Sequence, residues 1–126
     1  MISDLNLSLA IDHGWVGDLS VTLHHVETGT SVDLIDQPGV PTSSFGCSGD
    51  DIDAVLDDEA AAPAEEACAA SAPALAGELI PNAALAAFDG ENLAGTWTLT
   101  ARDVSLGVSG TLDDWCLIVN LSLIHI

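Results

Sequence analysis

The first indication of the fold comes from two runs of sequence, GTWTLTARD at residues 95–103 and GTLDDWCLIV at residues 110–119. In both runs, apolar residues such as Trp97, Leu99 and Trp115 recur at every second position. A period of two with β-branched and aromatic residues predicts β-strands. The polar, glycine-containing stretch between the runs predicts two neighbouring strands that pair and are joined by a loop. Each tryptophan can bury roughly 150–250 Å2, so we expect both to fill the core between two sheets.

The N-terminal third contains three further alternating runs. Apolar residues occupy every second position in residues 4–12 and again in 18–26, where Leu19 begins the apolar face. Two glycines in 13–17 interrupt the pattern, which predicts an antiparallel hairpin of the two runs. Residues 31–35 form a short third strand that ends before a Pro-Gly turn.

The alternation fades in the middle of the chain. Residues 61–76 are rich in alanine, but prolines interrupt them, so we expect a loop with short turns rather than a helix. Residues 54–60 fit a short strand or one helical turn, residues 77–81 a short edge strand, and residues 84–88 a packed loop. Many short strands separated by Gly and Pro predict an all-β protein, an antiparallel jelly-roll-like β-sandwich.

The composition restricts the partners of the protein. The chain has 126 residues, which suits one domain, and carries 20 acidic residues against one basic residue. A net charge of −19 repels nucleic acid and anionic membranes, so we expect neither as a partner. No apolar run approaches the roughly 20 residues of a membrane span. Such acidity indicates solubility, a salty habitat or a bound hard cation.

Several motifs together resemble one known family. The motifs are IDHGWVGDLSVTL at 11–23, ETGT at 27–30, the spaced Pro81, Leu85, Phe88 and Gly90, and the two tryptophan runs. In this order they resemble the P domain, also called the P/Homo B domain, of proprotein convertases and bacterial subtilisin-like proteases. The resemblance covers roughly residues 4–121, and we expect the domain to span residues 1–121. The tail at 122–126 does not match the family and is of doubtful origin. In ETGT, glutamate and threonine replace the serine and proline that are usual in the family.

The resemblance implies an accessory role. It implies a non-catalytic domain that follows the catalytic domain of a secreted subtilisin-like serine endopeptidase and supports its folding, stability or activity. The partner would be that catalytic domain in cis, the domain itself would be a monomer, and the location would be extracellular or periplasmic, with the signal outside this segment. Two alternatives remain, a stand-alone binding or adhesion module, and the same domain attached to a metalloprotease. Family members usually carry a further strand ahead of residue 4, so we expect a bare sheet edge.

The sequence contains no motif of a known catalytic site. A nucleophilic triad needs an exposed nucleophile, a base and an orienting acid, but the sequence has no Gly-x-Ser-x-Gly elbow and no subtilisin-type serine block. His24 and His25 are adjacent, so on a strand they point to opposite faces and cannot share a zinc ion. We therefore expect no catalytic residues and no organic cofactor in this segment.

The three cysteines suggest one disulfide. Cys47 and Cys68 enclose the acidic part of the long central segment, and in a secreted domain a disulfide between them is the economical interpretation. Closing a loop of this size contributes about 3 kcal/mol in the chain-entropy model. Cys116 is out of phase with its apolar neighbours, which predicts a half-buried free thiol on the other face of its strand. The alternative is a disulfide with a second molecule.

Acidic residues gather inside the same loop. Calcium binds six to eight oxygen ligands, often from one flexible segment. The candidate calcium ligands are Asp50, Asp51, Asp53, Asp57 and Asp58. The alternative is a solvated loop without a metal, and the spacing of an EF-hand is absent.

Trp15 lies in the turn between the first two predicted strands. It either packs over the end of the sandwich or contacts the neighbouring catalytic domain. An exposed indole would favour the contact.

Overall fold

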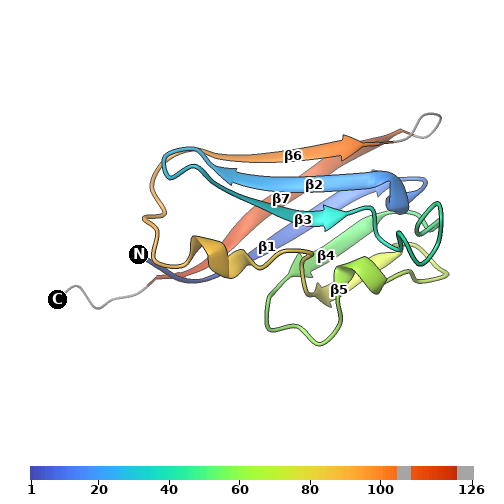
Figure 1. Cartoon of the computed structure of the whole chain (residues 1–126), viewed down its shortest axis with the longest axis horizontal. Helices are drawn as coiled ribbons and strands as arrows, with labels where there is room; N and C mark the ends of the chain where they lie inside the picture. The colour runs from blue at the N-terminus through green and yellow to red at the C-terminus, as the bar shows by residue number, and fades with distance from the viewer. Residues whose placement is uncertain (105–108, 122–126) are drawn as a thin grey trace.

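The computed structural model describes residues 1–104 and 109–121, which form a β-sandwich (Figure 1). The strands are β1 (Ile2–His13), β2 (Leu19–His25), β3 (Thr30–Asp36), β4 (Ile52–Leu56), β5 (Leu75–Leu79), β6 (Trp97–Asp103) and β7 (Gly110–Leu121). Three short 3-10 helices connect them, η1 (Val16–Asp18), η2 (Ala64–Glu66) and η3 (Leu85–Phe88). The predicted all-β sandwich is confirmed. In the described part of the chain, no helix has the length and apolar character needed to cross a membrane.

The described strands form two sheets. The larger sheet has four strands in the order β5-β4-β1-β7, and the smaller has three in the order β3-β2-β6. The alternating residues of β1 and β2 bury one face of each strand completely, because that face points into the space between the sheets. Leu19, Val21 and Leu23 of β2 are buried in this core, as are Leu7 and Leu9 of β1.

The predicted hairpin of residues 4–12 and 18–26 is wrong. The two strands exist, but β1 belongs to the larger sheet and β2 to the smaller one. The turn through η1 carries the chain across the sandwich from one layer to the other. Both strands bury their apolar faces, but they do so against each other across the core rather than side by side. An alternating pattern specifies which face is buried and leaves the hydrogen-bonding partner open.

The predicted pairing of the two tryptophan strands is wrong for the same reason. β6 pairs with β2, where Leu23 lies opposite Leu99, and β7 pairs with β1, where Leu9 lies opposite Trp115. Trp97 and Trp115 therefore approach the core from opposite sheets, and both are only half-buried. The connection between these strands lies partly outside the described residues, as does the tail at 122–126.

The central segment contributes more structure than expected. β4 inserts beside β1 in the larger sheet, and β5 runs parallel to β4, so the sandwich is not wholly antiparallel. The edge strand expected at 77–81 is confirmed as β5, shifted toward the N-terminus. The segment 61–76 contains η2, and the packed loop at 84–88 is η3, whose Leu85 and Phe88 are buried.

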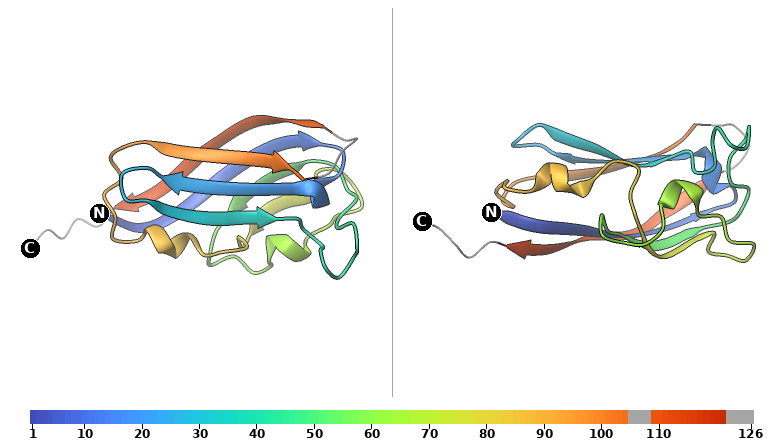
Figure 2. Two further views of the ribbon diagram at one scale, coloured as in Figure 1. Left: turned by 45° about the horizontal axis from the view of Figure 1, so that its top comes forward. Right: turned by 60° about the horizontal axis from the view of Figure 1, so that its bottom comes forward.

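The two long sides of the sandwich differ. On one side, η2 and η3 lie across the gap between the layers (Figure 2, right). There the outer edge of β3 is covered, because the backbone nitrogens of Asn82 and Ala83 donate hydrogen bonds to Leu34 and Asp33 at 2.8 and 3.0 Å. On the other side, β6 and β7 are the outermost strands of their sheets (Figure 2, left).

Candidate functional site

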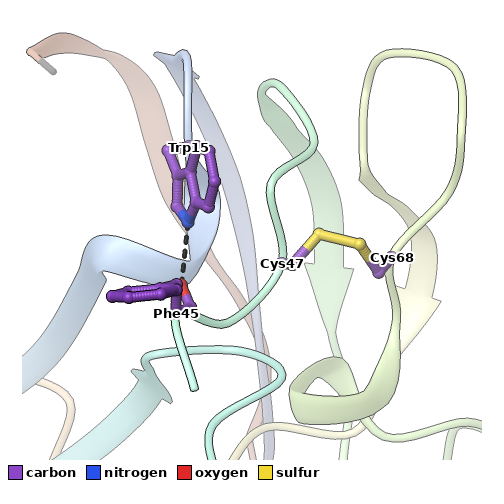
Figure 3. The surroundings of a disulfide bond; sticks show 4 residues. All are labelled: Trp15, Phe45, Cys47 and Cys68. Atoms are coloured by element: carbon purple, nitrogen blue, oxygen red, sulfur yellow. Dashed lines mark hydrogen bonds between the residues drawn. A yellow bond between two sulfur atoms is a disulfide. The ribbon is translucent and has the colours of Figure 1, made fainter. Parts of the chain in front are cut away.

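The predicted disulfide is present at one end of the sandwich. Cys47 and Cys68 are bonded, with their Cα atoms 5.7 Å apart (Figure 3). The bond ties the segment after β3 to the segment after η2. The enclosed loop is not structureless, since β4 lies within it. Cys116 is a free thiol on β7 and is exposed, not half-buried as predicted.

Two glycines allow the backbone to pack tightly around Cys47. The backbone nitrogen of Gly17 donates to Cys47 O, and the nitrogen of Cys47 donates to Pro38 O, both at 2.8 Å. A Cβ atom on Gly17 would lie 2.5 Å from the nitrogen of Cys47, and one on Gly39 would lie 2.8 Å from the same nitrogen. Side chains larger than hydrogen are therefore excluded at both positions by backbone that cannot move aside.

Trp15 holds the loop next to the disulfide. Its side chain is half-buried, and its indole nitrogen donates a hydrogen bond of 2.8 Å to the carbonyl of Phe45 (Figure 3). The aromatic ring offered to solvent is that of Phe45, which is 76% exposed. Sequence reasoning missed Phe45, because a single aromatic residue in a loop carries no periodic signal.

A cavity of about 540 Å3 lies beside the disulfide, lined among others by Val40, Ser43, Cys68 and Glu65. Burial raises the pKa of Glu65 to about 7, although the backbone nitrogen of Asp36 donates a hydrogen bond to its carboxylate. The negative charge of Asp36 adds to the increase in pKa. Glu65 therefore changes its charge near neutral pH within this cavity.

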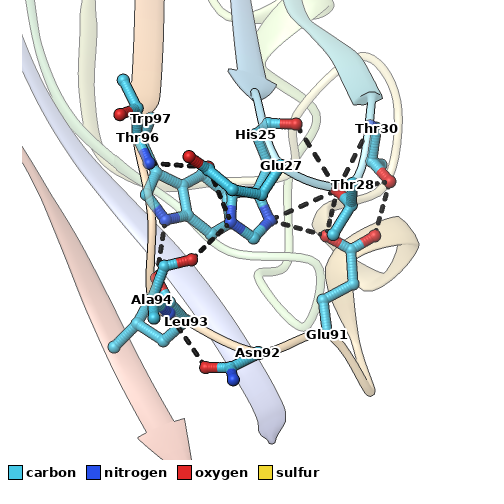
Figure 4. A network of polar contacts seen from close by, with 10 residues as sticks. All are labelled: His25, Glu27, Thr28, Thr30, Glu91, Asn92, Leu93, Ala94, Thr96 and Trp97. Atoms are coloured by element: carbon cyan, nitrogen blue, oxygen red, sulfur yellow. Dashed lines mark hydrogen bonds and ion pairs between the residues drawn. The ribbon is translucent and has the colours of Figure 1, made fainter.

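A polar network surrounds His25 at the opposite end of the sandwich (Figure 4). The ring is fully buried and stacks on Trp97, with centroids 4.0 Å apart and planes 7° apart. Its Nδ1 lies 2.9 Å from Glu91 Oε1, and its Nε2 lies 3.1 Å from the carbonyl of Ala94. An ionised carboxylate and a carbonyl can only accept, so the doubly protonated imidazolium satisfies both at once.

The pKa values in this network shift in the directions that favour an ion pair. Burial lowers the pKa of His25, but the hydrogen bonds to Glu91 and Ala94 and the nearby carboxylates outweigh burial and raise it overall. Burial raises the pKa of Glu91, but hydrogen bonds from Thr30, His25 and Thr28 lower it overall. Sequence reasoning considered His25 only as a zinc ligand and missed Glu91, which is 66 residues away in the chain.

The second buried histidine joins the two sheets. His13 of β1 lies 2.8 Å from the carboxylate of Asp103 on β6 through its Nε2. Its Nδ1 accepts a hydrogen bond from the backbone nitrogen of Trp15, and its backbone nitrogen donates to Asp51. Both ring nitrogens are thus used in contacts that hold the fold together.

The predicted calcium ligands do not converge. Two of the five, Asp50 and Asp51, precede β4, and two others, Asp57 and Asp58, follow it. The five-residue strand separates the first pair from the second by roughly 17 Å. Asp58 accepts hydrogen bonds of 2.8 Å from the backbone nitrogens of Leu85 and Ala86. In residues 1–104 and 109–121, no three or more histidine, cysteine or acidic side chains are grouped so that they could hold a metal ion. The five carboxylates do not fit one calcium ion in this arrangement, and calcium binding stays a prediction.

Comparison with known proteins adds independent evidence. Residues 70–119 match the family model of the proprotein convertase P-domain. The suspected resemblance is confirmed. The matched segment begins shortly before β5, includes η3 and β6, and ends within β7. No curated protein and no solved structure matches the chain.

The match to the P domain covers only some of the motifs that suggested it. The segment with Pro81 and Phe88 lies inside residues 70–119, as do the two tryptophan runs at 95–103 and 110–119. The motif at 11–23, which supplies His13 and Trp15, lies outside that range. The structure nevertheless joins the two parts, since β1 pairs with β7 and β2 pairs with β6.

Proposed function

We propose that the chain is a non-catalytic accessory domain of a secreted subtilisin-like serine endopeptidase, and that it stabilises an adjacent catalytic domain by docking onto it. The observation that carries this proposal is the match of residues 70–119 to the proprotein convertase P-domain. The disulfide supports secretion, because such bonds persist in oxidising compartments.

The use of the buried histidines supports a non-catalytic role. A histidine that acts as a general base needs one ring nitrogen directed at a nucleophile. His13 and His25 each direct both ring nitrogens at groups within the fold, namely at backbone atoms and carboxylates. The two remaining histidines of the chain are His24 and His125, and His125 lies outside the described residues.

Phe45 is the side chain that we propose for the contact with the catalytic domain. The disulfide and Trp15 hold its loop in place, so little conformational entropy is lost on docking. An exposed aromatic ring on a preorganised loop is the kind of residue that carries binding energy in interfaces.

The test compares the domain alone with a protein that also contains a subtilisin-like catalytic domain. Alone, the chain should hydrolyse no peptide substrate, and clear turnover would overturn the proposal. In the two-domain protein, Phe45→Ser should lower the melting temperature of the catalytic domain and leave that of the isolated accessory domain unchanged. Val26→Ser is the matched control, because Val26 is 47% exposed in the turn at the opposite end of the sandwich.

A further inference from the structure

The cavity beside the Cys47–Cys68 disulfide has the size of a ligand site. Its volume of about 540 Å3 falls within the range of about 300–1,000 Å3 that is usual for small-molecule sites. One wall is formed by the loop after β3, within residues 39–48, and the other by residues 65–68, which include the end of η2. The disulfide joins the two walls (Figure 3), so little conformational entropy is lost when a ligand enters.

Glu65 is a half-buried carboxylate on the wall of this cavity. Its Oε2 accepts a hydrogen bond of 3.0 Å from the backbone nitrogen of Asp36, and its carbonyl oxygen accepts one of 2.8 Å from the backbone nitrogen of Gly39. Its other carboxylate oxygen, Oε1, has no hydrogen-bond or ion-pair partner among the described residues. The fold therefore holds Glu65 in place and leaves one of its oxygens available to a ligand.

No basic side chain pairs with Glu65 in the part of the chain that the structure describes. The sequence has no lysine, and its one arginine, Arg102, lines a different cavity. Glu66 is the second charged residue on the wall, and it is also acidic. The loop at 39–48 contributes no charged side chain. A positive charge that pairs with Glu65 in this cavity would therefore come from another molecule.

The rest of the wall indicates which kind of cation fits. Val40 and Ala67 offer apolar surface, and Thr42 and Ser43 offer hydroxyl oxygens that can accept hydrogen bonds. A guanidinium group has five N–H donors, no acceptor and weak hydration, which suits a partly buried carboxylate. A calcium ion needs six to eight oxygen ligands and is a poorer occupant, because only two carboxylates line the cavity.

We propose that this cavity binds an organic cation with a guanidinium group on a short aliphatic stem, the guanidinium against Glu65 and the stem against Val40 and Ala67. Small alkylguanidines and the arginine side chains of polypeptides share this chemistry, and the test below separates the two sources. The inference does not depend on the proposed function.

The titration of Glu65 provides a signature for such a ligand. Burial raises the pKa of Glu65 to about 7, and the negative charge of Asp36 adds to the increase. The charged groups beside Glu65 are Asp36 at the end of β3 and Glu66 of η2. A bound cation favours the ionised carboxylate, so binding should release protons near pH 7. The affinity should accordingly fall about tenfold from pH 8 to pH 6.

The test titrates the isotope-labelled full chain with butylguanidinium and with its neutral isostere butylurea, at pH 8 and constant ionic strength. We expect amide NMR shifts confined to residues 39–48 and 65–68, and at least about tenfold weaker binding of butylurea. Equal binding of butylurea, or shifts spread over the acidic surface, would overturn the proposal. Calcium chloride that displaces butylguanidinium from these residues would assign the cavity to a metal and also reject it.

A capped tripeptide, Ac-Ala-Arg-Ala-NH2, identifies the source of the guanidinium. Its citrulline analogue is the neutral control and should bind at least about tenfold weaker. Tighter binding of the arginine tripeptide than of butylguanidinium assigns the ligand to a polypeptide, and the reverse order assigns it to a small molecule. Either order supports the proposal, whereas binding of neither compound contradicts it.

Two glutamates supply matched variants. Glu65→Gln keeps an oxygen that can accept the hydrogen bond from Asp36 but removes the charge, so it should weaken binding at least about tenfold and abolish the pH dependence. Glu78→Gln removes the same charge from an exposed position on β5 and should bind as the wild type does. Unchanged affinity of Glu65→Gln would contradict the proposal. If that variant does not fold, calorimetry of the wild type at pH 7 in two buffers of different ionisation enthalpy decides. It should show release of about half a proton per bound butylguanidinium, and no release would reject the site.

Discussion

His25 connects three separate parts of the chain through one side chain. It lies on β2, stacks on Trp97 of β6, and faces Glu91 and Ala94 in the segment before β6. Thr28 and Thr30 also direct their hydroxyls at Glu91, so the carboxylate has donors other than the imidazolium. The network therefore fixes the turn between β2 and β3 against the start of β6.

The first prediction concerns the pH dependence of this network. The pKa of His25 is raised above its ordinary 6.5, so its contribution to stability is fully present below pH 6.5 and is lost as pH rises through the folded value. The pKa of Glu91 is lowered below 4.5, so its contribution is present above pH 4.5 and is lost as pH falls through the folded value. The network is therefore strongest between pH 4.5 and 6.5.

Urea unfolding of the wild type and of His25→Gln measures this contribution. Near pH 5.5 the variant should be less stable by about 2–3 kcal/mol, because a hydrogen bond to a charged group is lost. Compared with pH 5.5, the difference in unfolding free energy between the two proteins should be smaller at pH 8 and also smaller at pH 3.5. A difference that stays constant over this range would contradict the protonated form of His25. His24→Gln, on the other face of β2, is the control and should show no such pH dependence.

At the level of elements, alternation predicted the strands well and their partners poorly. β1, β2, β3 and β6 lie where period-two patterns placed them, because each strand buries one face. β4 was left open between strand and helical turn, since five residues are too few to establish a period. The crossover through η1 was missed, because it depends on the contact of Gly17 with Cys47, which lies 30 residues later.

The second prediction tests that crossover. Gly17→Ala should reduce stability by about 1–3 kcal/mol, because the added methyl group would meet the backbone around Cys47. Gly29→Ala is the control. Gly29 has a φ of +76° and open space around it, so only the conformational cost of about 1 kcal/mol applies. Chemical denaturation of the two variants measures the comparison, and an equal or larger loss for Gly29→Ala would contradict the close packing at η1.

At its disulfide end, the molecule is held by a covalent bond in addition to its packed core. Cys47 and Cys68 are 21 residues apart in sequence and close a loop that contains β4. The core of the sandwich consists mainly of aliphatic side chains, and its two core tryptophans are half-buried. Loss of the covalent closure should therefore affect the stability of the whole molecule.

The third prediction counts thiols and measures the effect of the bond. The native oxidised protein should titrate one thiol with Ellman reagent, that of exposed Cys116, and the reduced unfolded protein should titrate three. Cys116→Ser should leave none in the native state. The double variant Cys47→Ser and Cys68→Ser should lose about 3 kcal/mol of unfolding free energy. Three reactive thiols in protein purified without reductant would contradict the bond.

The amino-acid order was sufficient for the strands, the apolar faces, the disulfide and the resemblance to the P domain, because these depend on local alternation and on motifs that can be recognised one at a time. Only the tertiary structure shows which strands belong to which sheet. It also shows that His25 contacts Glu91 and that β4 separates the acidic residues. These features depend on which distant segments meet, and that is settled by packing two sheets around one core. The partial burial of Trp97 and Trp115 belongs to the same class, since both are predicted to be buried until the neighbours of β6 and β7 are known.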